Sequence, residues 1–377
     1  MKNPLSYIEI SKSALRNNIA QFRTLLPKGN LLVLVVKANA YGHGLKEVVK
    51  IANSFVDMFQ VDDIEELREV RIVTNKRVLI LGYIQNSDLE ELADLNATLG
   101  VYNIETLKEL ERIGKKKNKK MIIHLKIDAL LGRQGVLLAD LKEILNTIQK
   151  SKYLILESIY SHFSNIEDTD NLEHAQNQFE YLMEAKRIVI NFGFKNITHH
   201  ISATSGMLSD IKNNWEGVLV RLGIGGYGLW PSEGMKKIFS KKIKLTPVLR
   251  WVSHIAQVKV VPKDFPIGYG LTYITKRQTK IAIIPQGYSD GYDRGLSNNS
   301  FVLIKGQKCS VLGRVAMNMF VVDVSSVKDV KLEDEVILLG SQNKREITSE
   351  MLAEKLNTIN YEIVARLNPL IRRVIVK

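Results

Sequence analysis

Reactive side chains recur in this sequence at points where a short apolar run stops. They include amines, an imidazole, hydroxyls and guanidinium groups, which together could bind a carbonyl compound and transfer protons. In chain order they are Lys37 after the run 31–36; Lys126, Asp128 and Arg133 around the end of 121–127; Ser161 and His162 after 154–160; Ser202 and Thr204 after 197–201; and Arg221 at the end of 217–221.

Lys37 can be interpreted in two ways from its position alone. A lysine after an apolar strand is often only the solvated end of that strand. Here neighbouring strands present cations, and partial burial beside them would lower the pKa of the amine, as a lysine that forms a Schiff base requires. Both interpretations stay open at this point.

The apolar runs alternate with helical patterns, which predicts a parallel sheet covered by helices. Eight such strands indicate a closed (β/α)8 TIM-type barrel, in which catalytic groups stand at the carboxyl ends of the strands. An open doubly wound sheet is the alternative, but the Gly-rich dinucleotide fingerprint is absent after the first strand. The expected strands are 31–36, 55–60, 77–81, 97–101, 121–127, 154–160, 197–201 and 217–221, with helices at 45–53, 64–73, 88–92, 105–113, 138–149 and 173–190.

The pattern changes after about residue 236, where apolar segments follow one another with turns instead of helices. This change predicts a second, mostly β domain. With 377 residues the chain is also long enough for two domains. We therefore expect an N-terminal segment at 1–9, a cofactor-binding barrel at 10–235 and a mostly β domain at 236–377.

Composition and charge exclude several classes of protein. The net charge is +13, but its densest lysine cluster, 115–120, has no interleaved aromatic residues and suits a solvated turn better than a nucleic-acid surface. No apolar run is long enough to span a membrane, and the first residues have no apolar signal-peptide core. A single cysteine, Cys309, forms no internal disulfide. We therefore expect no nucleic-acid or membrane partner, and a cytoplasmic protein.

The seven histidines do not predict a metal site, because none has the spacing of a metal-ligand pair. The glycine-rich segment 223–228 directly after the eighth strand is more informative. Backbone N–H groups of such a loop can hold a phosphate, although glycines alone are a weak signal.

A series of short segments in a fixed order covers nearly the whole chain. They are Val-Lys-Ala-Asn-Ala-Tyr-Gly-His-Gly at 36–44, Gly-Arg-Gln-Gly at 132–135, Ser-His-Phe at 161–163, Arg-Leu-Gly-Ile at 221–224, Tyr-Gly at 269–270, Gly-Tyr-Ser-Asp-Gly-Tyr at 287–292, Gly-Arg-Val-Ala-Met at 313–317 and Ile-Asn-Tyr-Glu at 359–362. In these segments the chain resembles the alanine racemases, pyridoxal-phosphate enzymes with a barrel and a β domain. The first segment is highly specific.

The resemblance implies a role for each matching residue. Lys37 would hold the aldehyde of pyridoxal 5'-phosphate as an aldimine, and Tyr269 of the partner subunit in a homodimer would be the second catalytic base. The phosphate would be held by Tyr41, Thr204, Tyr361 and the backbone at Gly223 and Ile224, with His162 against the pyridine ring and Arg221 facing its nitrogen. Arg133 and the Met317 backbone would bind the substrate carboxylate, and Lys126 would be carbamylated and orient Arg133.

Two segments depart from the family pattern. Ala203-Thr204 stands where many members have Asn-Ser, and Ala316-Met317-Asn318 stands where many have Cys-Met-Asp. A threonine hydroxyl can replace serine at a phosphate, whereas alanine removes a hydrogen-bonding side chain. These departures affect affinity and substrate preference more than the type of reaction.

The predicted reaction is the interconversion of L-alanine and D-alanine by a lysine and a tyrosine, which the family uses to supply D-alanine for peptidoglycan. Three alternatives remain: a racemase that also accepts serine, a decarboxylase of the same architecture and a non-catalytic cofactor carrier. Such decarboxylases protonate with a cysteine, but the apolar surroundings of Cys309 suit a packed structural thiol better. The carrier lacks a second domain.

Overall fold

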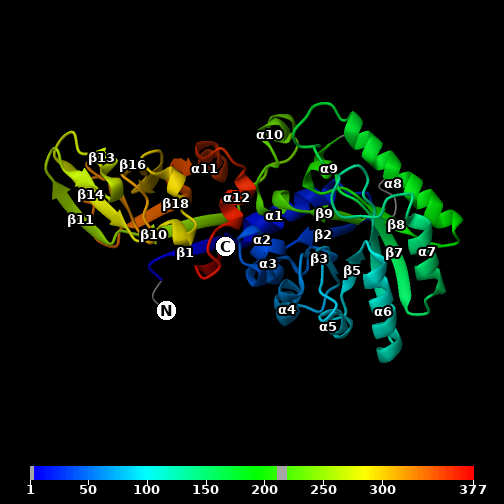
Figure 1. The fold of residues 1–377 in the computed structure, drawn as a ribbon. Coiled ribbons are helices and arrows are strands. Elements are labelled where there is room, and N and C mark those ends of the chain that lie inside the picture. Colours follow the sequence, from blue (N-terminus) through cyan, green and yellow to red (C-terminus); the bar gives the residue numbers. More distant parts are fainter. Residues whose placement is uncertain (1–3, 210–218) are drawn as a thin grey trace. The chain divides into compact units, whose positions relative to one another are not determined.

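The computed structural model describes residues 4–209 and 219–377 (Figure 1). The chain divides into two units. The first, here the barrel unit, consists of Leu15–Ala38 and Val48–Thr246; the second, here the β unit, consists of Met1–Ala14, Asn39–Glu47 and Pro247–Lys377. The units interleave along the sequence, so their limits differ from the expected segments 1–9, 10–235 and 236–377.

The barrel unit contains an eight-stranded parallel sheet with the order β8-β7-β6-β5-β4-β3-β2-β9. The two edge strands, β8 and β9, also meet. The backbone N–H of Arg221 in β9 donates to the carbonyl of Ser202, just after β8, at 3.2 Å. The expected eight-stranded barrel is therefore confirmed. Its strands are β2 (Leu31–Val35), β3 (Met58–Val61), β4 (Val78–Ile80), β5 (Thr98–Val101), β6 (Met121–Lys126), β7 (Leu154–Tyr160), β8 (Thr198–His200) and β9 (Leu219–Leu222).

Helices connect these strands and lie on the outside of the sheet (Figure 1). Helix α4 shows why they form: Ile64, Leu67 and Val70 are buried along one face, and the Asp63 side chain accepts a hydrogen bond from the Glu66 N–H at the start of the helix. The helices of this part are α1 (Lys12–Thr24), α3 (Leu45–Ala52), α4 (Ile64–Val73), α5 (Leu89–Asp94), α6 (Ile104–Lys117), α7 (Leu141–Lys150), α8 (Glu173–Asn191), α9 (Thr204–Leu208) and α10 (Glu233–Phe239).

The lysine cluster at 115–120 lies partly in helix α6 and not only in a turn. The helix continues to Lys117 and ends at Asn118, which has a left-handed conformation with φ 46°. Lys116 and Lys117 pair with Glu90 and Asp94 at 2.7 Å. Cations in the last turn favour the helix carboxyl end, which explains why the helix is longer than expected.

The β unit contains a ten-stranded sheet in which the first and last strands of the chain are neighbours. Strand β1 (Tyr7–Ser11) pairs antiparallel with β10 (Leu249–His254) and parallel with β20 (Arg372–Val376). Residues 7–9 of the expected segment 1–9 thus lie in β1. The other strands are β11 (Gln257–Val261), β14 (Thr279–Ile284), β15 (Phe301–Ile304), β16 (Gln307–Leu312), β17 (Phe320–Asp323), β18 (Glu335–Gln342) and β19 (Arg345–Ile347), and β12 (Pro266–Ile267) with β13 (Tyr273–Ile274) forms a separate pair.

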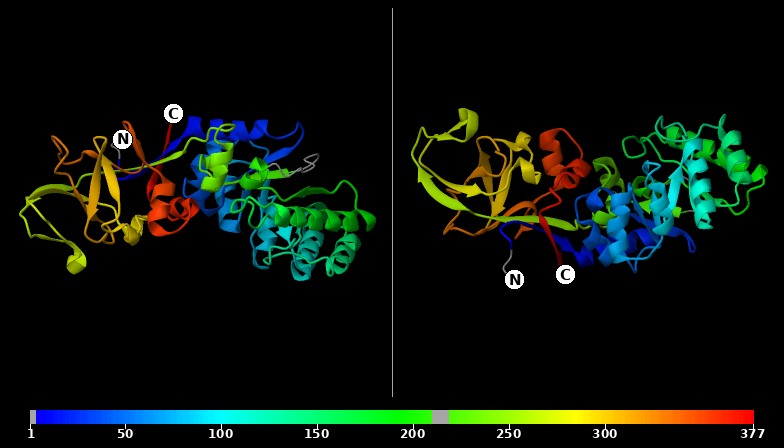
Figure 2. Two further views of the ribbon diagram at one scale, coloured as in Figure 1. Left: turned by 90° about the horizontal axis from the view of Figure 1, so that it is seen from above. Right: turned by 60° about the horizontal axis from the view of Figure 1, so that its bottom comes forward.

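Two short helices, α11 (Ser349–Leu356) and α12 (Asn360–Ala365), complete the β unit. Figure 2 shows them in red beside the orange and yellow strands of the same unit. The mostly β architecture of this part is confirmed. Among the described residues, no helix is both long enough and apolar enough to cross a membrane.

Candidate active site

Lys37 follows β2 and begins the short helix α2 (Lys37–Tyr41). Its ammonium nitrogen lies 3.3 Å from Oδ1 of Asp62. The same region is tied down by the Glu66 carboxylate, which accepts the backbone N–H groups of Ala38 at 2.5 Å and Asp62 at 2.9 Å. Asp62 was not predicted from the sequence, and it forms a direct ion pair with the amine.

The turn after Lys37 is left-handed, which the sequence did not predict. Ala38, Asn39, Ala40 and Tyr41 have φ between 52° and 53°. Each such residue costs roughly 1–2 kcal/mol relative to a right-handed helix. Strain of this kind is characteristic of functional sites, where the surrounding structure must hold it.

Contacts within the β unit stabilise the end of this turn. The Asn39 side chain accepts the Leu45 N–H at 2.9 Å. A Cβ atom on Gly42 would lie 1.8 Å from the Val364 carbonyl oxygen, so only glycine fits there. The turn places the ring of Tyr41 6.1 Å from that of Tyr361. Two residues that the resemblance assigns to phosphate binding are therefore neighbours.

Arg221 is buried in β9, and fixed acceptors surround its guanidinium group. Its Nη2 donates to the carbonyls of Ser161 at 2.8 Å and Ile201 at 2.9 Å, and lies 3.0 Å from Nδ1 of His162. Its Nη1 contacts Nδ1 of His200. Burial and then the charge of Arg221 hold the pKa of both histidines well below the ordinary value, so both are neutral.

A hydrogen-bonded relay runs from Arg221 through His200 and His124 to Glu157. Nε2 of His200 lies 3.0 Å from Nδ1 of His124, and Nε2 of His124 lies 2.9 Å from the Glu157 carboxylate. Arg77 pairs with that carboxylate at 2.5 Å. Because an arginine can only donate and a carboxylate can only accept, the two ends set the direction of every bond. His124 and His200 therefore carry their proton on Nε2.

Lys126, at the end of β6, is buried, and its Nζ donates to Oε1 of Gln134 at 3.1 Å. Its pKa is lowered to about 8, first by burial and then by the charges of Arg133 and Arg221. The neutral amine is therefore a minor but larger fraction at neutral pH than in an ordinary lysine. The sequence placed this lysine at a strand end but gave no sign of its burial.

Arg133 lies on an exposed turn whose backbone is organised by Asp128. The Asp128 carboxylate accepts the N–H groups of Leu131 and Gly132 at 3.0 Å and of Arg133 at 3.1 Å. A Cβ atom on Gly135 would lie 2.2 Å from the Asp128 nitrogen. The Gly-Arg-Gln-Gly motif therefore closes around Asp128 and leaves the Arg133 side chain exposed.

Hydrogen bonds join Thr204 to the glycine-rich loop. The buried hydroxyl of Thr204 accepts the N–H groups of Gly223 at 3.1 Å and Gly225 at 3.2 Å. Ile224 lies between them and begins a short 3-10 helix, η1 (Ile224–Tyr227). The Ser202 hydroxyl is buried nearby, and no described residue forms a hydrogen bond with it.

Tyr269 and Met317 lie in loops of the β unit. Tyr269 begins a short 3-10 helix, η2 (Tyr269–Leu271), between β12 and β13, and it is 75% exposed. Met317, between β16 and β17, is 55% exposed. The loop that contains Tyr269 packs against the Arg314 guanidinium at Gly270, where an added Cβ atom would lie 2.7 Å from the guanidinium carbon. The two exposed residues, which the resemblance assigns to the site, thus belong to neighbouring segments of one unit.

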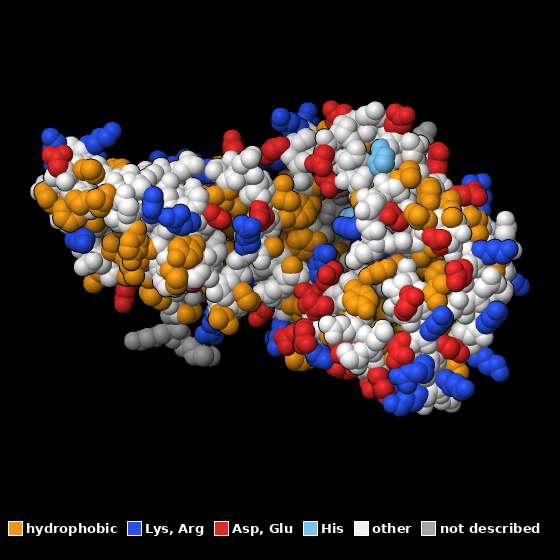
Figure 3. Space-filling model, in the orientation of Figure 1, with side chains coloured by type: hydrophobic (Ala, Val, Ile, Leu, Met, Phe, Trp, Pro, Cys, Tyr) orange, Lys and Arg blue, Asp and Glu red, His pale blue; other side chains and the backbone are white. Residues whose placement is uncertain are grey.

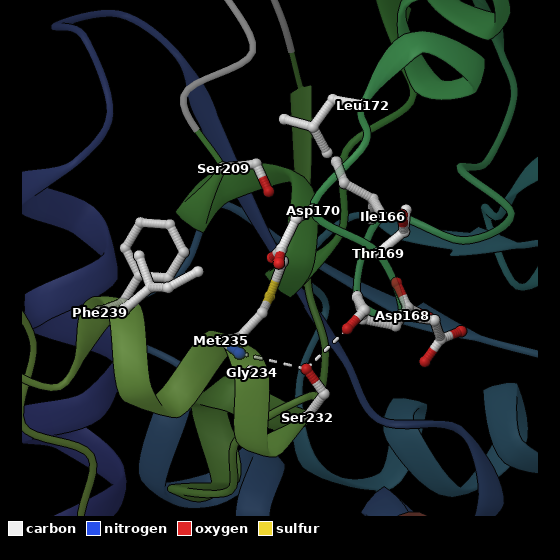
Figure 4. Close-up of a pocket in the computed structure, with 12 residues that line it drawn as sticks. Ile166, Asp168, Thr169, Asp170, Leu172, Ser209, Ser232, Gly234, Met235 and Phe239 are labelled. Atoms are coloured by element: carbon white, nitrogen blue, oxygen red, sulfur yellow. Dashed lines mark hydrogen bonds between the residues drawn. The ribbon is translucent and has the colours of Figure 1, made fainter.

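A cavity of about 550 Å³ in the barrel unit contains none of the predicted site residues. It lies between the segment after β7 and α10, where the Ser232 hydroxyl donates to the Glu167 carbonyl at 2.7 Å and accepts the Met235 N–H at 3.2 Å (Figure 4). Its wall is a mixture of acidic and apolar side chains. The predicted reactive groups of the barrel unit lie at or just after the ends of its strands instead.

Comparisons with known proteins identify the family of the chain. The family described as "Alanine racemase, N-terminal domain" matches residues 10–231, and the "Alanine racemase, C-terminal domain" matches residues 248–375. The chain belongs to the alanine racemase family. It is therefore an amino-acid racemase, as the sequence predicted.

Individual relatives resemble the chain over almost its full length. Alanine racemase 1 of Caldanaerobacter subterraneus subsp. tengcongensis is 35% identical over 97% of this chain and 94% of its own. The alanine racemase structure of Clostridium difficile 630 has 32% identity and a TM-score of 0.91, covering 100% of this chain and 97% of its own. The Bacillus anthracis alanine racemase structure, which contains bound L-Ala-P, has 28% identity and a TM-score of 0.93, covering 100% of this chain and 96% of its own.

Proposed function

We propose that this chain interconverts L-alanine and D-alanine with pyridoxal 5'-phosphate, using Lys37 and Tyr269 as its two bases. The observation that supports this most directly is the buried Arg221, held by His162, His200 and two backbone carbonyls at the strand ends. A fixed, permanently charged donor on β9, the strand that pairs with the one before Lys37, suits a cofactor with a ring nitrogen and an aldehyde.

The residues of the barrel unit fit pyridoxal phosphate. Two loop N–H groups converge on the Thr204 hydroxyl, which accepts both and keeps its own proton to donate to a phosphate oxygen. The buried Ser202 hydroxyl offers a further donor. In the proposal, Tyr41 and Tyr361 add phenol groups to the phosphate, and His162 packs against the ring.

Bound pyridoxal phosphate supplies an electron sink that makes the α-proton of alanine acidic. Lys37 and Tyr269 then remove this proton on one face of the α-carbon and return one on the other. Arg221 stays protonated, so a cofactor ring nitrogen that faced it would remain unprotonated, which would weaken the electron sink and limit side reactions. Arg133 and the Met317 N–H bind the substrate carboxylate.

Carbamylation of Lys126 is part of the proposal. The neutral amine attacks carbon dioxide, a C–N bond forms, and the proton is released to water. Its pKa of about 8 provides the neutral amine. Because Arg133 and Arg221 are the cations that depress this pKa, they would also stabilise the resulting anion, and the anion would orient Arg133.

We further propose a homodimer in which Tyr269 completes the site of the partner subunit. Tyr269, Leu271, Ile274, Met317 and Met319 are all more than half exposed in the β unit, and exposed apolar groups gather over β11, β13 and β14 in Figure 3. A second copy would cover them. The role in supplying D-alanine for peptidoglycan in the cytoplasm is what the family resemblance implies.

An assay that follows the optical rotation of L-alanine together with carbon dioxide release tests the function. We expect loss of rotation without carbon dioxide, and no turnover in the Lys37→Ala variant. Carbon dioxide release would support the decarboxylase instead, and the absence of both signals in the loaded wild-type chain would reject catalysis.

Two observations bear on the alternatives. Cys309 is buried in β16, and burial is the main cause that raises the pKa of its thiol to about 12, so it is a poor proton donor for a decarboxylase. Serine differs from alanine by one hydroxyl, and a pocket rejects one added group only modestly. We therefore expect slow turnover of serine.

A further inference from the structure

The backbone around Met317 forms a tight turn at residues 316–319. The Ala316 N–H donates to the Met319 carbonyl at 2.9 Å and closes this turn. Met317 and Asn318 occupy its tip, and both side chains are exposed. The conformation of the turn determines where the Met317 N–H points.

The segment 287–289 packs against this turn and fixes its two carbonyls. The Ala316 carbonyl accepts the Tyr288 N–H at 3.1 Å, and the Met317 carbonyl accepts the Ser289 N–H at 3.0 Å. A Cβ atom on Gly287 would lie 2.2 Å from the Ala316 oxygen, so the approach requires glycine. In a trans peptide the N–H points opposite to the C=O, so the Met317 N–H is directed away from Tyr288.

Two hydrogen bonds made by side chains reinforce this arrangement. The Ser289 hydroxyl donates to the Met317 carbonyl at 2.8 Å, and Nδ2 of Asn318 donates to the Ser289 hydroxyl at 2.8 Å. Serine has one proton to donate, whereas an amide nitrogen can only donate. The amide of Asn318 therefore directs the serine proton toward the Met317 carbonyl.

We propose that Ser289 and Asn318 are positioning residues for the Met317 N–H, and so set the affinity of this enzyme for the substrate carboxylate. This inference rests on the proposed function, in which the Met317 N–H binds that carboxylate. It also assigns a role to Asn318, which departs from the family pattern. An aspartate at position 318 would accept the serine proton, and the Met317 carbonyl would lose one of its two donors.

The test uses the loaded enzyme and the variants Asn318→Asp, Asn318→Ala and Ser289→Ala. In Asn318→Asp the Ser289 hydroxyl would donate to the new carboxylate instead of to the Met317 carbonyl. We expect the KM for L-alanine to rise about five- to tenfold, which corresponds to the loss of about one hydrogen bond. The kcat should stay within about twofold of wild type, because the weakened contact binds the carboxylate equally in the ground state and the transition state. Ser289→Ala should raise the KM by about two- to fivefold. Asn318→Ala removes the donor that orients the serine proton without reversing the hydroxyl, so we expect the KM to rise by about two- to threefold, less than for Asn318→Asp.

Propionate, which has a carboxylate but no amine, provides a second measurement. Its inhibition constant should rise in the same order as the KM. Asn343→Asp, at the turn between β18 and β19, adds the same charge elsewhere in the β unit and should change neither constant. Melting temperatures within about 2 °C of wild type would exclude a simple folding effect.

The double variant Ser289→Ala/Asn318→Asp separates hydrogen-bond reversal from the added charge. If Asn318 acts through Ser289, Asn318→Asp has only a small further effect in the Ser289→Ala background. An undiminished effect there, or equal KM values for wild type and Asn318→Asp, overturns the inference while racemisation remains intact. Failure of the wild-type enzyme to racemise alanine overturns the proposed function and this inference together.

Discussion

Replacement of Glu157 by glutamine removes the charge at the outer end of the histidine relay. The glutamine carbonyl can still accept the proton from Nε2 of His124, so the change tests the charge and not the shape. The carboxylate normally accepts from His124 at 2.9 Å and pairs with Arg77. We expect the variant to be less stable than wild type at neutral pH.

The size of the effect follows from the environment of the carboxylate. The hydrogen bond from His124, followed by the contributions of Arg77, lowers the pKa of Glu157 from 4.5 to about 2 despite partial burial. At face value this depression corresponds to about 3 kcal/mol of stability at neutral pH. The side chain is 33% exposed, and solvent screening leaves about 1–2 kcal/mol.

The sign of the pH dependence is also fixed. A depressed folded-state pKa contributes stability that is fully present above the unfolded value of 4.5 and is lost as the pH falls through about 2. Glu157→Gln lacks this titration. The stability difference between wild type and variant should therefore be largest at neutral pH and shrink below about pH 4.5.

Urea unfolding at several pH values measures this difference. Glu233→Gln is a matched control, because Glu233 pairs with Lys236 at 3.1 Å where the two side chains are 58% and 47% exposed. We expect a loss of less than about 0.5 kcal/mol for the control. The reasoning fails if both variants lose the same stability at neutral pH. Nitrogen NMR of His124 and His200 should also show the proton on Nε2, and the opposite tautomer would refute the direction of the relay.

Three further predictions concern the turn, the modified lysine and the dimer. Gly42→Ala should lower the free energy of unfolding by at least about 2 kcal/mol in urea, because its Cβ atom would lie 1.8 Å from the Val364 carbonyl oxygen; wild-type stability would contradict this. Crystals grown with bicarbonate should show density beyond Nζ of Lys126, and density that ends at the amine contradicts carbamylation. Mixing Lys37→Ala with Tyr269→Phe subunits should restore roughly a quarter of wild-type activity after exchange, if sites are independent. No recovery despite demonstrated exchange would reject a base supplied across the dimer.

The sequence determined the architecture because its signals are local. Apolar runs at 31–36 and 121–127, separated by helical patterns, gave strands at Leu31–Val35 and Met121–Lys126. Periodicity of this kind depends only on neighbouring residues and on the need to bury them. The same reasoning placed Lys37, Lys126 and Arg221 at strand ends. It did not predict that the two units interleave along the sequence. The first strand belongs to the β unit because β1 pairs with β20, a strand at the other end of the chain.

The tertiary structure alone decided the details that make the strand ends chemically useful. His124, Glu157 and His200 meet only because of the register between β6, β7 and β8, which no single segment encodes. The left-handed turn from Ala38 to Tyr41 contains residues that avoid this conformation locally, and contacts with distant segments must hold it. Local preferences select strands and helices, whereas strain and buried polar groups persist only where distant residues stabilise them.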